Sequence, residues 1–93
     1  MDQRRKWKER LSGTLDSRGE SLPLQPIMEL CGDRRIWIEN HRGVRKYTDQ
    51  EIWVATRYGF LQIQGESLKV CRMEGSMLVI TGRIRHIHIH KEG

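Results

Sequence analysis

The stretch that decides the fold is GFLQIQG at residues 59–65. Its apolar residues Leu61 and Ile63 alternate with Gln62 and Gln64, and a glycine stands at each end. Successive side chains of a β-strand point to opposite faces, so this alternation predicts a strand with one apolar and one polar face. Glycines at both ends are typical of turns, and an antiparallel sheet with one solvated face explains the pattern.

The same pattern recurs from residue 27 to the C-terminal end. Short apolar runs follow one another at roughly ten-residue intervals, separated by glycine-bearing turns, which is typical of all-β proteins. Because the connections are short, consecutive strands are expected to pair as antiparallel neighbours. We predict an all-β antiparallel meander of about eight short strands, arranged as a sandwich, an open sheet or a small barrel. The predicted strands are 27–31, 35–39, 44–47, 51–57, 60–64, 68–73, 77–81 and 83–90.

The last predicted strand contains an irregularity of phase. Ile84 is out of step with Ile87 and Ile89, because residues on one face recur at every second position. A β-bulge near residues 85–86 would restore the phase. Alternatively, Ile84 lies on the other face with the tryptophans.

The N-terminal residues have a different character. We expect a basic helix and linker at 1–21, followed by a single antiparallel β domain at 22–93. Trp7 and Leu11 lie four residues apart, as on one face of a helix, among five Lys and Arg residues. So short a helix is not stable alone in water, so it is expected to dock on a partner or an anionic membrane. The candidate docking residues are Arg4, Arg5, Trp7, Lys8 and Leu11.

Composition limits the partners and the compartment. Lys and Arg outnumber Asp and Glu by 17 to 12, which favours an anionic partner or simply a solvated surface. Cys31 and Cys71 form no ligand motif, and no secretory signal is evident, so we expect two reduced, partly buried thiols in a cytosolic protein. The sequence contains no run of about 18 apolar residues, so no membrane span is predicted.

Three histidines at alternate positions raise the possibility of a metal site. His86, His88 and His90 are expected on one face of one strand, about 6.5–7 Å apart. That spacing is too wide for three ligands of one ion, and no carboxylate or cysteine cluster completes a site. The pattern therefore predicts a solvated polar face, with no metal or cofactor.

Catalytic motifs are not evident in the sequence. His41 lies in an NHRG stretch at residues 40–43, which is typical of a tight turn, without a nucleophile or orienting carboxylate nearby. No phosphate-binding glycine loop is present. We predict that the protein is not an enzyme, and that its candidate turn residues are structural. These residues are Asn40, His41, Gly43, Gly59 and Gly65.

Trp37 and Trp53 are each expected on the face opposite the apolar strand residues. They form either a stacking platform for bases or a second small core under the N-terminal helix and loop. The platform would suit a small basic nucleic-acid-binding β domain, which is the alternative function. The second core is favoured, because so small a domain cannot easily leave tryptophans in water.

Several of these stretches together resemble the YabP/YqfC family of sporulation proteins. They are IWIENHRGV at 36–44, GFLQIQG at 59–65 and GRI at 82–84, and the basic start RRKW at 4–7 is similar to the YqfC branch. The resemblance implies a mother-cell protein of endospore-forming bacteria, acting in spore envelope (cortex and coat) development. It implies a membrane protein of the YqfD type as partner, and it supplies no catalytic residues.

We therefore expect a cytoplasmic assembly or adaptor module, located in the mother cell and peripherally at the forespore membrane. Unpaired edge strands favour a homo-oligomer. Nucleic acid is not the expected partner under this interpretation.

Overall fold

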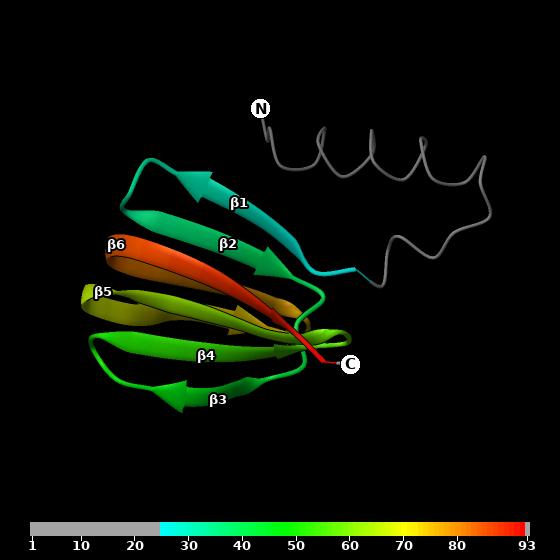
Figure 1. Ribbon diagram of the computed structural model, residues 1–93. Helices are drawn as coiled ribbons and strands as arrows, with labels where there is room; N and C mark the ends of the chain where they lie inside the picture. Colours follow the sequence, from blue (N-terminus) through cyan, green and yellow to red (C-terminus); the bar gives the residue numbers. More distant parts are fainter. Residues whose placement is uncertain (1–24, 93) are drawn as a thin grey trace.

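A computed structural model describes residues 25–92 of the chain. The predicted N-terminal helix and linker, with the docking residues they carry, lie outside the described residues. Within residues 25–92 all regular structure is β, in six antiparallel strands (Figure 1). The strands are β1 (Ile27–Cys31), β2 (Arg35–Glu39), β3 (Val44–Tyr47), β4 (Glu51–Thr56), β5 (Gly59–Glu74) and β6 (Met77–Lys91).

The prediction of about eight short strands is wrong in number, because the last four predicted strands are two long ones. Segments 60–64 and 68–73 belong to β5, and segments 77–81 and 83–90 belong to β6. Gly65 and Gly82, which were expected to end strands, lie instead where the long strands approach other backbone closely. A Cβ at Gly65 would overlap the carbonyl oxygen of Arg83, so glycine lets the strands bend together without ending them.

The strand order is β1-β2-β6-β5-β4-β3, so the simple meander is also wrong. Consecutive strands pair as predicted, except that β2 pairs with β6 and not with β3. This pairing places Ile36 beside Ile80 and Ile38 beside Leu78, and all four side chains are buried. Apolar matching across a long sequence separation therefore decides the place of β2.

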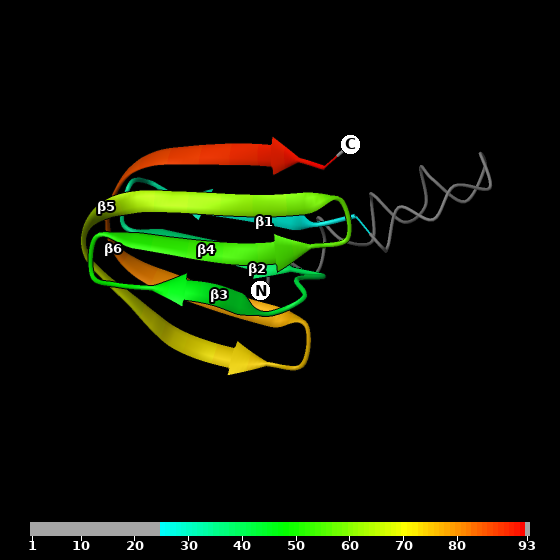
Figure 2. The same cartoon turned by 60° about the horizontal axis from the view of Figure 1, so that its bottom comes forward.

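The single open sheet curls on itself, because β5 and β6 run through both of its parts (Figure 2). The β1–β2 layer consists of these two strands with residues 69–74 of β5 and 77–81 of β6, and the β3–β4 layer consists of β3 and β4 with residues 59–66 and 83–91.

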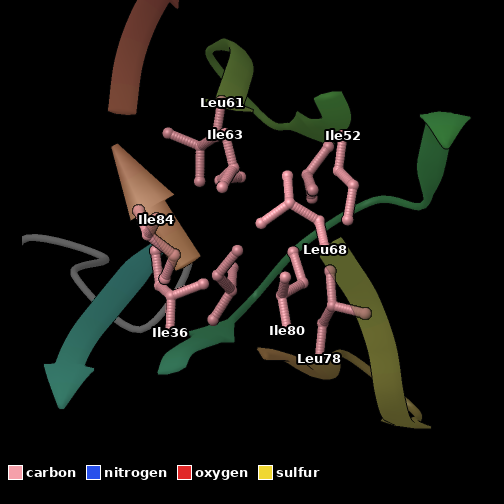
Figure 3. Packing of buried hydrophobic residues seen from close by; sticks show 10 residues of the cluster. Ile36, Ile52, Leu61, Ile63, Leu68, Leu78, Ile80 and Ile84 are labelled. Carbon is pink, nitrogen blue, oxygen red and sulfur yellow. The ribbon is translucent and has the colours of Figure 1, made fainter. Parts of the chain in front are cut away.

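The core lies between the two layers. Leu61 and Ile63 face Ile36 and Ile80 across it (Figure 3). No polar or charged residue is fully buried among the described residues, so apolar burial of about 1.5–3 kcal/mol per large side chain stabilises this region. The buried cluster is Ile36, Ile38, Ile52, Val54, Leu61, Ile63, Leu68, Leu78, Ile80 and Ile84.

The predicted bulge in the last strand is confirmed. Gln64 pairs with His86 and the next residue, Gly65, pairs with Ile84, so Arg85 is the extra residue of β6. The bulge allows Ile84 and Ile87 to pack on the same core despite their spacing of three. The alternative, in which Ile84 shares a face with the tryptophans, is therefore wrong.

Trp37 and Trp53 lie on the outer faces of different layers. Each alternates with core residues of its strand, β2 in one layer and β4 in the other. They therefore form no shared second core within the described residues.

The expectation of partly buried thiols is also wrong. Cys31 and Cys71 are free and exposed. Cys31 ends β1, and Cys71 lies in the second half of β5, where only β6 pairs with it. Both are edge positions, where the strand has a neighbour on one side only.

Candidate interaction surface

Beyond the bulge, β6 has an open edge at residues 85–91. In this range β6 pairs with β5 on one side, and no described strand lies on the other. Up to residue 84 the backbone on this side of β6 is hydrogen-bonded to the β1–β2 turn. Ile84 N donates to Asp33 O at 2.7 Å, and Gly82 N donates to Arg34 O at 3.1 Å. The end of β6 lies at the same end of the molecule as the start of β1 (Figure 1).

Two isoleucines present the unpaired backbone groups of this edge. Glu92 N donates to Tyr58 O at 2.9 Å, and the register pairs Leu61 with Ile89 and Ile63 with Ile87. In an antiparallel ladder hydrogen-bonded pairs alternate with non-bonded pairs. Glu92 and Tyr58 form a hydrogen-bonded pair, so the Ile89–Leu61 and Ile87–Ile63 pairs, an odd number of positions away, are non-bonded. The N–H and C=O groups of Ile87 and Ile89 therefore point away from β5, toward the open edge.

An apolar groove of about 370 Å³ lies between the start of β1 and the end of β6. Its walls come from β1, from the β4–β5 turn and from the open edge. Ile89 is on the core face of β6 and is nevertheless 62% exposed, because nothing in the described chain lies beyond the edge. The apolar lining residues are Pro26, Met28, Tyr58, Phe60, Leu61 and Ile89.

The histidine row lies on the outer face of the same stretch of β6. His86, His88 and His90 are all exposed, as predicted for a polar face, with adjacent ring centroids 5.9 and 6.2 Å apart. Nε2 of His88 lies 2.9 Å from Gln64 Oε1, and Nε2 of His90 lies 2.8 Å from Gln62 Oε1. An amide oxygen only accepts, so both Nε2 atoms carry the proton and donate.

The row continues across the sheet into an aromatic and acidic cluster. Trp53 stacks on His90 with ring centroids 4.9 Å apart, and Phe60 meets Trp53 edge-on at 6.0 Å. Glu51 accepts from Lys46 at 2.8 Å and from Gln62 at 2.6 Å. These bonds lower the pKa of Glu51 to about 2. The bond from Lys46 has the largest effect, and Trp53 donates a further one. Glu51 therefore stays ionised beside Trp53, where Lys46 balances its charge.

The turn after β2 shapes the other side of the groove. Asn40 and Gly43 have positive φ values of 65° and 112°, and Gly43 N donates to Nδ1 of His41 at 2.9 Å. Nδ2 of Asn40 donates to the carbonyl oxygen of Gln25 at 2.8 Å, and Gln25 lines the groove. Asn40 thus fixes the start of β1.

The same turn joins the two layers. Arg42 N donates to Ala55 O at 2.6 Å, and Ala55 N donates to Gly43 O at 2.8 Å. Burial lowers the pKa of His41, against a smaller opposing effect of the Met77 backbone. His41 therefore favours its neutral form and acts as a structural acceptor.

The sequence model of the YabP family matches residues 23–93. The chain belongs to the YabP family. The match includes the NHRG turn, all the walls of the groove and the whole of β6. No curated protein and no solved structure matches the chain. Membership of the YabP family indicates a sporulation-related protein.

The sequence-predicted sites of this YabP-family protein fall into two groups. The candidate docking residues of segment 1–12 lie outside the described residues. Gly59 and Gly65 both lie where β5 approaches β6, with Gly59 at φ 149° and paired with Lys91. Sequence reasoning missed the groove, since no local signal marks Ile89 as an edge residue.

The described residues contain no helix long and apolar enough to cross a membrane. In residues 25–92 no group of three or more His, Cys, Asp or Glu side chains is arranged to hold a metal ion.

Proposed function

We propose that this YabP-family chain is a non-enzymatic assembly or adaptor module of spore envelope (cortex and coat) development. It acts in the cytoplasm of the mother cell, at the forespore surface. The observation that carries the proposal is the open edge of β6 beside an exposed apolar groove. Unpaired strand edges bind other chains through main-chain hydrogen bonds, and adjacent pockets select their side chains.

The edge also shows features that limit uncontrolled association. Arg85 forms a bulge, and Lys91 ends the strand. Bulges and charged residues are the usual protection of edge strands against aggregation. This edge is protected against aggregation but carries the exposed side chain of Ile89, which suits binding of a specific partner.

The remaining parts of the proposal concern where the module is held. The family resemblance supports a membrane protein of the YqfD type as partner. The basic segment with Arg4, Arg5, Trp7, Lys8 and Leu11 supplies a peripheral contact with anionic lipid or with acidic groups on that partner, at about 1 kcal/mol per basic residue near the membrane. Association of several copies adds further contacts.

Compartment-specific complementation tests the proposal. The gene is deleted in its spore-forming host and restored under a promoter active only in the mother cell or only in the forespore. We expect the deletion to give spores with defective envelopes, and the mother-cell copy alone to restore them. Normal spores after deletion, or rescue by the forespore copy alone, would contradict the proposed function.

One observation favours nucleic-acid binding as the alternative, namely the outward-facing cluster of Trp53, Phe60 and His90. Aromatic side chains on a sheet stack on bases. However, Glu51 beside Trp53 is ion-paired with Lys46 at 2.8 Å, so this cluster offers no unpaired positive charge to a phosphate. The alternative predicts binding to single-stranded RNA or DNA that weakens steeply with salt and is lost in Trp53→Ala. Absent binding, or a flat salt response, excludes it.

A further inference from the structure

We propose that the open edge of β6 binds an extended segment of a partner protein as a seventh strand, and that this segment alternates apolar with acidic residues. The inference rests on the proposed adaptor function and specifies the docking site and the chemistry of the partner.

The backbone of β6 has outward-facing hydrogen-bonding groups that an added strand can use. Ile87 and Ile89 direct their N–H and C=O groups outward, and residue 91 continues the alternation. Three such residues match a short strand of about five to six residues. The added strand is limited at one end, because the bonds of Ile84 and Gly82 to the β1–β2 turn already occupy the edge there.

The groove determines which residues the segment carries on one face. Side chains of an added strand alternate between the groove and the outer face. On the groove side they meet Ile89, with Met28 and Leu61 behind it. Apolar residues at alternate positions would cover the exposed isoleucine.

The charges of β6 determine the residues on the other face. Between residues 83 and 91 the strand carries three His and three Lys or Arg, with no Asp or Glu; Arg85 is ion-paired with Glu66 of β5 at 3.1 Å, and Lys91 lines the groove. On the outer face an added strand lies next to His86, His88 and His90. Opposite charges on neighbouring strands stabilise a sheet, whereas like charges destabilise it. Acidic residues at the alternate positions complete the match.

The same charges argue against a second copy as the occupant. Two β6 edges paired antiparallel would place two histidine rows side by side, with Lys91 of each copy near the basic residues of the other. Such a pairing places like charges on neighbouring strands and is unfavourable. A partner with the opposite pattern is therefore favoured over self-pairing.

Peptide binding to the full-length protein tests the proposal. The probes are a monomeric peptide in which valine alternates with glutamate, its valine–lysine counterpart, and a peptide with the glutamate composition in shuffled order. Binding is followed by the fluorescence anisotropy of a label on each peptide. Amide exchange of Ile87 and Ile89 is measured with and without peptide, and light scattering gives the oligomeric state.

The alternating acidic peptide is expected to bind at least about tenfold more tightly than the other two and to protect the Ile87 and Ile89 amides. Ile89→Glu should weaken binding about tenfold or more, because it removes the apolar contact. Met73→Glu is the matched control, since Met73 is 55% exposed in the second half of β5, at an open edge of the β1–β2 layer where only β6 pairs with it. This variant should bind as the parent protein does.

Equal binding of all three peptides, or equal loss in both variants, would overturn the proposal. Protection of Ile87 and Ile89 without peptide would also overturn it. In a dimer it would show a second copy on the edge, and in a monomer it would show residues 1–24 there. Because these measurements use purified protein, their failure is distinct from normal sporulation of the deletion strain, which would refute the adaptor function itself.

Discussion

Replacing Gly65 with alanine is expected to cost far more stability than a usual glycine-to-alanine change. An added Cβ would overlap the Arg83 carbonyl oxygen and lie 3.0 Å from the Arg83 carbonyl carbon and 3.2 Å from Ile84 Cα. All three atoms belong to the backbone, so no side-chain rotation relieves the overlap. The two long strands must separate where they bend.

The expected loss for Gly65→Ala is about 3 kcal/mol in the free energy of unfolding, the upper end of the overpacking range. Since 1 kcal/mol corresponds to about 4–8 °C in a domain of this size, Tm should fall by about 12–24 °C. Thermal unfolding followed by circular dichroism, with urea unfolding at 25 °C, measures both quantities.

Gly75→Ala is the control for this prediction. Gly75 has φ 56°, and a Cβ there would meet no atom within 4 Å. Only backbone strain of about 1–2 kcal/mol is expected. If Gly65→Ala were no more destabilising than Gly75→Ala, the bend of β5 and β6 around residue 65 would be refuted.

Three further changes have defined outcomes. Gly43→Val should lower the free energy of unfolding by about 1–3 kcal/mol, because φ is 112° there while the space is open; an unchanged Tm would contradict the turn. Burial lowers the pKa of His41, so the folded state binds fewer protons than the unfolded state. Stability should therefore be full above about pH 6.5 and fall as the pH drops below it. His41→Asn should reduce this slope in pH-dependent urea unfolding, and an equal slope would show that His41 is not its source. Deleting residues 1–12 should leave the circular dichroism of the β-sheet intact while dispersing a fluorescent fusion from the forespore boundary; unfolding or unchanged localisation would argue against a docking segment.

The sequence predicted the local elements of the fold and missed their long-range arrangement. Alternation in GFLQIQG placed Leu61 and Ile63 on the core face correctly, and the out-of-phase Ile84 was enough to predict the bulge. Both inferences rest on neighbours a few residues apart. The pairing of β2 with β6 joins residues about forty positions apart, and no local pattern specifies it.

The candidate site depends on that long-range pairing. The histidine row was predicted as a polar face because side-chain direction follows from sequence spacing alone. Ile89 was expected to belong to the apolar face, but its exposure arises because β6 has no further neighbour after residue 84. Which strand becomes an edge is a property of the whole sheet.

The adaptor function is tested most directly by the localisation of edge variants in sporulating cells. Fluorescent fusions of the parent protein, Ile89→Glu and Met73→Glu are compared for enrichment at the forespore and for the yield of heat-resistant spores. Both substitutions are at exposed apolar positions, so neither should lower Tm appreciably. Docking through the open edge of β6 predicts that Ile89→Glu becomes diffuse and loses spores, while Met73→Glu matches the parent. Forespore enrichment and spore yield of Ile89→Glu equal to those of the parent would contradict it.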